Sequence, residues 1–90
     1  MKVRNKDHPE RIGSASRFDV NTCAPQEIFV AYEDEPVSEF ACDLEVFVEA
    51  KGQWLRFGEA EKNGDIIRDN FNTCFFEPKT EEDRERGYTL

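Results

Sequence analysis

The sequence has few cysteines, a single histidine and no long apolar run, and each shortage excludes a class of protein. A membrane-spanning helix needs about 18 or more consecutive apolar residues, which no segment approaches. The three cysteines are an odd number at wide spacing, which argues against a disulfide framework and favours a reducing compartment. The basic first residues are not followed by the apolar segment of a signal peptide. We therefore expect a cytoplasmic protein.

Signatures of metal binding and catalysis are also missing. Zinc would need four ligands, whereas the chain offers His8 and three separated cysteines without a Cys-x-x-Cys pair. There is no glycine-rich phosphate loop, no serine in a nucleophile elbow and no calcium-loop pattern. Cys23 would become a nucleophile only if His8 folded over it. We expect no metal, no cofactor and no enzymatic activity.

What the chain does have is charge and aromatic side chains. Of its 90 residues, 36% are charged, 38% are hydrophobic and 12% are aromatic. The aromatic content is too high for a disordered acidic chain, and the length allows one domain. The composition therefore predicts a thin, aromatic-rich core under a heavily charged surface.

The net charge of −8 is unevenly distributed. Residues 1–26 carry five basic and three acidic side chains, and residues 51–90 carry seven basic and nine acidic ones. Residues 27–50 carry eight acidic side chains and no Lys or Arg. Such a concentration of one sign serves solubility or attracts a positive partner, and it disfavours direct binding to nucleic acid.

The chain divides by composition into three parts. Residues 1–15 mix charge with Pro9 and Gly13 and indicate a flexible basic arm. Residues 16–78 hold the β-like patterns and are expected to form a single β-rich domain. Residues 79–90 are a charged tail, either disordered or folded as a short helix supported by Glu/Arg pairs.

Strand patterns dominate the central part. The apolar residues of segment 40–49 alternate with polar ones, which is typical of a strand with one buried face. Lys51-Gly52 predicts a tight turn, and 53–58 follows as the return strand. Segment 65–76 fits a strand or a short helix, with the strand favoured by the Asn63-Gly64 turn before it. The fold class expected is mainly β: a small antiparallel sheet of about five strands, as a barrel or sandwich, with one short helix allowed in 65–76 or the tail.

The acidic central strands are the candidate binding surface. Side chains two apart on a strand are separated by ~6.8 Å, which is comparable to the spacing of phosphates along a nucleic-acid strand. Phe47 shares the solvent-facing parity with these acids and would be an apolar anchor. An exposed strand can also carry charge only for solubility and protection against aggregation. The candidate partner-binding residues are Glu33, Asp34, Glu35, Glu39, Asp43, Glu45, Phe47 and Glu49.

These residues favour a small acidic binding protein, acting as a monomer or homodimer on a basic protein partner. The most concrete hypothesis is an inhibitor that blocks a nucleic-acid-binding enzyme by mimicking a phosphate backbone, as small acidic proteins of phages and mobile elements do. An immunity protein against a basic toxin nuclease would use the same physics. The alternative is a structural or assembly subunit or adaptor whose contact is a sheet edge or the Tyr88–Leu90 tail.

Overall fold

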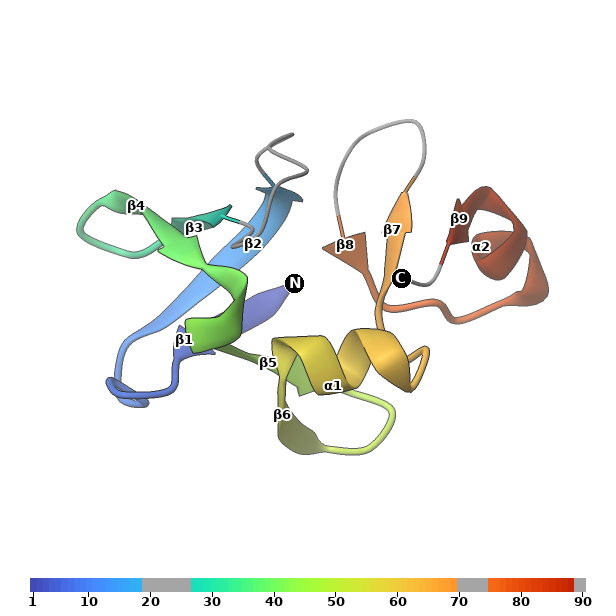
Figure 1. Cartoon of the computed structure of the whole chain (residues 1–90), viewed down its shortest axis with the longest axis horizontal. Helices are drawn as coiled ribbons and strands as arrows, with labels where there is room; N and C mark the ends of the chain where they lie inside the picture. Colours follow the sequence, from blue (N-terminus) through green and yellow to red (C-terminus); the bar gives the residue numbers. More distant parts are fainter. Residues whose placement is uncertain (19–26, 70–74, 89–90) are drawn as a thin grey trace.

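The protein is built of short strands joined by tight turns, with three short helical segments (Figure 1). The computed structural model describes residues 1–18, 27–69 and 75–88. In chain order, the elements are β1 (Lys2–Asn5), β2 (Ile12–Phe18), β3 (Glu27–Ala31), β4 (Pro36–Phe40), the 3-10 helix η1 (Ala41–Asp43), β5 (Leu44–Val48), β6 (Gln53–Arg56), α1 (Phe57–Lys62), β7 (Ile67–Asp69), β8 (Phe75–Phe76), α2 (Glu81–Arg86) and β9 (Gly87–Tyr88).

The strands form two antiparallel sheets. The larger sheet has six strands in the order β4-β3-β2-β1-β5-β6, and the smaller has three in the order β8-β7-β9. The expectation of a mainly β, antiparallel fold is thus confirmed, with more strands than the five or so predicted. The radius of gyration of 12.2 Å is that of a compact single domain of this length.

β1 lies in the middle of the larger sheet, between β2 and β5. Val3 is fully buried on the inner face, opposite Val46 of β5. Lys2 and Arg4, on either side of Val3 in the sequence, face the outer side of the sheet. The alternating pattern of this strand therefore consists of one apolar residue between two cations. The expectation of a flexible arm over residues 1–15 is therefore wrong, because this segment supplies β1 and the first part of β2.

The alternating segment 40–49 is not one continuous strand. β4 ends at Phe40, η1 turns the chain, and β5 begins at Leu44. Leu44, Val46 and Val48 of β5 are at most 1% exposed, as the alternation predicts, but Phe40 and Cys42 of the same parity are exposed. Because η1 interrupts the strand between Phe40 and Leu44, Phe40 and Cys42 do not face the core as the apolar residues of the same parity in β5 do.

The turn predicted at Lys51-Gly52 is present, with Gly52 at a φ of 63° that favours glycine. The return strand is shorter than the expected 53–58, because it ends at Arg56 and α1 begins at Phe57. The helix buries Phe57, Ala60 and Glu61, which share one helical face at spacings of three and four residues.

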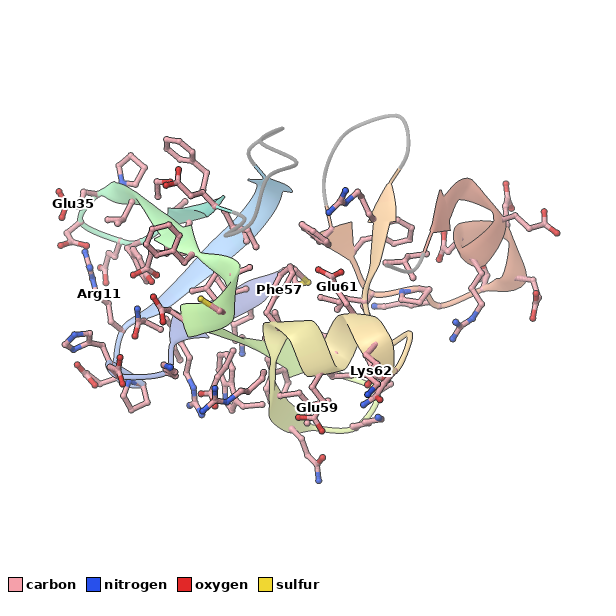
Figure 2. The ribbon with its side chains drawn as sticks, in the orientation of Figure 1. Arg11, Glu35, Phe57, Glu59, Glu61 and Lys62 are labelled. Carbon is pink, nitrogen blue, oxygen red and sulfur yellow. The ribbon has the colours of Figure 1, made fainter. Side chains whose placement is uncertain are left out.

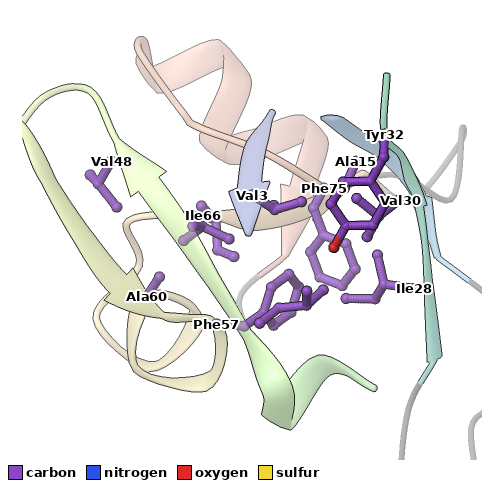
Figure 3. Packing of buried hydrophobic residues seen from close by; sticks show 12 residues of the cluster. Val3, Ala15, Ile28, Val30, Tyr32, Val48, Phe57, Ala60, Ile66 and Phe75 are labelled. Atoms are coloured by element: carbon purple, nitrogen blue, oxygen red, sulfur yellow. The ribbon is translucent and has the colours of Figure 1, made fainter. Parts of the chain in front are cut away.

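The core lies between the inner face of the larger sheet, α1 and β8 (Figure 3). Val3, Ile28 and Val46 from three strands are fully buried there. Phe57 of α1 meets Phe75 of β8 edge to face, with ring centroids 4.7 Å apart. This aromatic pair joins the helix to the smaller sheet and fixes both against the larger one.

The C-terminal segment is folded. In α2, Thr80 caps the helix by accepting a hydrogen bond from the Asp83 backbone N–H at 3.1 Å, and β9 then pairs with β7. The tail therefore adopts the helical alternative. In segment 65–76, the described parts form strands β7 and β8, while residues 70–74 lie outside the described residues, as do Cys23, Cys74 and Leu90.

Candidate partner-binding surface

The predicted acidic residues do not form one row. Only Glu45 lies within β5, since Asp43 belongs to η1 and Glu49 follows the end of the strand. The remaining four lie on or beside β4, and Glu39 is on the opposite face of the sheet from Glu45. Within the described residues, these acids therefore do not form the predicted row of carboxylates at phosphate-like spacing along one strand. They fall instead into two groups.

The first group is neutralised by cations from the two ends of the chain. β1 and β5 are neighbours, so Arg4 and Lys6 lie opposite the acids of 43–45. Glu49, the third acid of this group, lies near Lys79, which follows β8 in the sequence. The pairs are Arg4–Glu45 at 2.8 Å, Lys6–Asp43 at 3.7 Å and Lys79–Glu49 at 3.7 Å.

The second group is the acidic hairpin, which we define as residues 27–40 with strands β3 and β4. It carries five carboxylates and no Lys or Arg. Among the described side chains, the only cation paired with it is Arg11, from the β1–β2 connection. The five carboxylates are Glu27, Glu33, Asp34, Glu35 and Glu39.

Arg11 binds the turn of the hairpin. Its Nη2 donates to both carboxylate oxygens of Asp34, at 2.7 and 2.9 Å, and lies 3.7 Å from Glu35. Figure 2 shows Arg11 and Glu35 at the same end of the molecule. The hydrogen bonds lower the pKa of Asp34 and raise that of Arg11. Glu33 is exposed and has no cation partner among the described residues, so the turn keeps a net negative charge.

Glu39 is held on the inner side of the hairpin. It accepts hydrogen bonds from the Tyr32 hydroxyl and from Asn5 Nδ2, the latter at 3.1 Å. Burial of Tyr32 and its hydrogen bond to this carboxylate raise the pKa of the phenol. Glu39 therefore positions the hairpin against β1 and is less available to a partner than Glu33 or Glu35.

Two exposed aromatic side chains lie on the outer face of the hairpin. Phe29 is 53% exposed and Phe40 is 42% exposed. Phe29 lies opposite Ser38, and Phe40 is two residues further along β4, so the two rings are diagonal neighbours. The sequence does not single them out, because alternation predicts a buried Phe40 and Phe29 lies within an apolar run.

Phe47, the predicted anchor, lies on the same outer face but has its own contacts. Its ring meets Trp54 edge to face with centroids 5.4 Å apart, and the Lys2 ammonium lies 4.8 Å from its centroid. It is half-buried, and it lines a hollow together with two lysines and two carboxylates, Lys2, Lys79, Glu49 and Glu77. The exposed aromatic side chains beside the acidic hairpin are thus Phe29 and Phe40.

Beside the turn, a surface hollow of about 450 Å³ is lined by both acids and apolar surface. Ile12, which is 49% exposed, contributes the apolar part. Glu10, Glu33 and Asp34 supply carboxylates around it, and Arg11, which pairs with Asp34, also lines it. An apolar surface rimmed by acids suits a Lys or Arg side chain, whose stem is apolar and whose head is charged.

A further titratable group lies away from the hairpin. Glu61 of α1 is only 8% exposed, and burial raises the pKa of its carboxyl although the charge of Arg68 acts in the opposite direction. Figure 2 shows Glu61 above α1, directed away from Glu59 and Lys62.

No group of three or more His, Cys, Asp or Glu side chains within the described ranges is arranged to hold a metal ion. None of the described helices is long and apolar enough to cross a membrane. No protein-family model, curated protein or solved structure matches the chain. The functional conclusion therefore depends on the surface itself.

Proposed function

We propose that the protein is a non-enzymatic binding protein whose acidic hairpin engages a basic surface of a partner protein. The most concrete form is an inhibitor that occupies the cationic groove of a nucleic-acid-binding enzyme in place of phosphates. The observation that carries the proposal is the charge of the acidic hairpin: five carboxylates, one pairing cation among the described side chains, and two exposed phenylalanines beside them.

The pattern of ion pairs favours the acidic hairpin, rather than the acids near β5, as the surface that binds the partner. Carboxylates already matched by Arg4, Lys6 and Lys79 give little further attraction to a cationic groove. Unmatched charges keep their long-range field, which attracts a basic partner and raises the association rate. The binding residues in this proposal are Glu27, Glu33 and Glu35. The first two have no cation partner among the described side chains, and Glu35 shares Arg11 with Asp34, which Arg11 already neutralises.

The exposed rings supply what charge alone lacks. Interfaces owe most of their affinity to a few apolar anchors, surrounded by polar residues that exclude water. Phe29 and Phe40 provide such an anchor next to the carboxylates, the role that the sequence assigned to Phe47. An acidic surface made for solubility alone would not need two exposed aromatic rings at its centre.

The compartment proposed is the cytoplasm. Cys42 is a free thiol on the surface, which is compatible with a reducing environment.

Charge reversal on the hairpin tests the proposal. Immobilised protein is exposed to nuclease-treated bacterial lysate and eluted with a salt gradient. A triple variant, Glu27→Lys, Glu33→Lys and Glu35→Lys, is compared with a control of equal charge change on α2, Glu81→Lys, Glu82→Lys and Glu85→Lys. We expect the wild type and the control to retain a nucleic-acid-binding enzyme that elutes at moderate salt, and the hairpin variant to lose it. Equal retention by both variants would contradict the proposal, as would retention of no such enzyme.

A further inference from the structure

The acidic hairpin ends in an open strand edge. β4 is the terminal strand of the larger sheet, and no described strand pairs with its outer side. Exposed edges of this kind are templates for another strand unless they are blocked by Lys, Pro or a bulge. β4 has no Lys or Arg. Its one proline, Pro36, is its first residue and removes a donor from the open edge only at that end of the strand.

The hydrogen-bond pattern shows which backbone groups are free. Tyr32 N–H donates to the Glu35 carbonyl at 3.1 Å, which makes these two residues a hydrogen-bonded pair of the antiparallel ladder. Such pairs alternate with non-hydrogen-bonded ones, so the pair Phe29 and Ser38 is of the second kind. The N–H and C=O groups of Ser38, and by the same alternation the N–H of Phe40, therefore point away from β3 toward the open edge. The Phe40 carbonyl is engaged by η1, for which Phe40 is the N-cap residue.

Side chains around this edge define what would bind there. Phe40 lies on the edge strand and Phe29 one strand inside it, both on the outer face, where their exposed rings offer apolar contact. Glu33 and Glu35 lie beyond one end of β4, and Glu27 lies opposite Phe40 at the other. An incoming strand would thus meet free backbone groups in the middle, aromatic rings on one face and negative charge at both ends.

We infer that an extended, basic segment of the partner adds to the larger sheet as a seventh strand along β4, with an apolar side chain on Phe29 and Phe40 and Lys or Arg residues toward the acids at both ends. This inference depends on the proposed function, because it specifies how the acidic hairpin holds its partner. In this type of recognition, the backbone supplies affinity and alternate side chains supply specificity.

Charge favours this occupant over a second copy of the chain. Pairing β4 with its own copy would bring two acidic hairpins together, each with five carboxylates. Like charges placed side by side are destabilising, whereas a basic segment turns the same charges into attraction.

The experiment selects a peptide and then removes the backbone contact. A displayed library of random 12-residue peptides is selected against the full-length protein, and the most enriched peptide is synthesised with a fluorescent label. Binding is compared among the wild type, Ser38→Pro and Ser38→Thr. Proline removes the N–H that faces the open edge and leaves the backbone bonds to β3 in place, since prolines are tolerated on edge strands. It also removes the Ser38 hydroxyl, which donates to Glu27 at 3.2 Å. Ser38→Ala, measured alongside, loses only that hydroxyl and should bind like the wild type. Threonine keeps the N–H. Thermal unfolding of each variant reports the fold.

A second measurement changes the peptide and leaves the protein untouched. Two versions are made, each with N-methyl groups on one of the two alternating sets of amides. Only one set faces β4 in an added strand, so only one version should lose binding.

We expect the enriched peptides to contain Lys or Arg and an alternating apolar residue. The selected peptide should bind Ser38→Pro at least about tenfold more weakly than the wild type and should bind Ser38→Thr unchanged. Only one of the two N-methyl versions should lose binding. Binding within twofold of wild type by a folded Ser38→Pro would overturn the inference, as would equal tolerance of both N-methyl versions or the enrichment of no basic peptide. A wild-type dimer in sedimentation that Ser38→Pro dissociates would assign the edge to a second copy instead.

The proposed function is separable in the same assay. If Glu33→Lys with Glu35→Lys abolishes peptide binding but Ser38→Pro does not, strand addition fails and the acidic hairpin remains the binding surface. If neither variant weakens binding, both proposals fail.

Discussion

Arg4 Nε donates a hydrogen bond to Glu45 Oε1 at 2.8 Å across strands β1 and β5. The guanidinium of Arg4 also lies over the Trp54 ring, 4.0 Å from its centroid. A cation expected in a flexible arm and an anion expected in a binding row therefore neutralise each other within the sheet. This pair explains why the excess negative charge lies on the acidic hairpin rather than near β5.

The coupling between these two residues is measurable by a double-mutant cycle with Arg4→Met and Glu45→Gln. Methionine keeps an apolar stem over Trp54, and glutamine keeps the shape of glutamate. Because both side chains are only 22–23% exposed, we expect each change to lower the unfolding free energy by about 1 kcal/mol, with a coupling of about 0.5–1 kcal/mol. Urea denaturation measures both. A coupling near zero would show that β1 is held by Val3 and backbone pairing alone.

Two glycines should respond in opposite directions to alanine. At Gly13, an added Cβ would lie 2.6 Å from Val30 Cγ1 and 2.9 Å from Tyr32 Cδ1, so Gly13→Ala should destabilise the protein by about 1–3 kcal/mol. At Gly58 of α1, nothing lies within 4 Å of the added atom, so Gly58→Ala should stabilise the helix by about 0.5 kcal/mol. Melting temperatures should move down and up respectively. Stabilisation by Gly13→Ala would mean that β2 and β3 are not in close contact there.

Phe57 is expected to be the most sensitive core position. It is 2% exposed and contacts Phe75, so Phe57→Ala should cost about 3–5 kcal/mol, a large part of the stability of so small a domain. Phe57→Leu retains most of the volume and should leave a folded protein with a lower melting temperature. Circular dichroism of the two variants measures the difference. A folded Phe57→Ala variant with a near-normal melting temperature would contradict the packing of α1 described above.

The buried carboxyl of Glu61 predicts a pH dependence with a definite sign. Its pKa in the folded protein is raised above the ordinary value of 4.5, so the ionised form costs stability once the pH rises through that raised pKa. Below 4.5 the group is protonated in both the folded and the unfolded chain, and the cost is absent. Glu61→Gln should therefore melt higher than the wild type at pH 7 and equally at pH 4. Thermal unfolding at the two values measures the difference, and a lower melting temperature for Glu61→Gln at pH 7 would show that attraction to Arg68 outweighs the burial.

Local patterns predicted local structure well. The apolar alternation of β5, the Lys51-Gly52 turn and the antiparallel class follow from side-chain parity and glycine conformation, which depend on neighbours in the sequence. The position of β1 depends on pairing with a strand about 40 residues away. Val3 is the only buried apolar residue in the pattern of β1, and one residue is not enough to predict a strand. The start of α1 at Phe57 is also hidden, because Trp54, Leu55 and Phe57 continue the composition of a strand.

The candidate surface was predictable in composition but not in position. The absence of Lys and Arg from 27–50 correctly locates the acids, but it cannot show which of them meet cations from elsewhere in the chain. That depends on the neighbours of β1. The exposure of Phe40 depends on η1, which interrupts an otherwise regular alternation.

The central place of β1 also bears on how the chain acquires its structure. β1 precedes the other described strands in the sequence, yet its pairing with β5 joins residues as distant as Arg4 and Glu45, 41 positions apart. The β3–β4 and β5–β6 hairpins close locally, whereas this pairing needs a long loop to close first, and such contacts are slow to form. Pairing of β1 with β5 is therefore the expected rate-limiting step of folding, because β1 and β2 also pair locally. Until it occurs, the edges of β1 and β5 that will meet remain open to incorrect pairing.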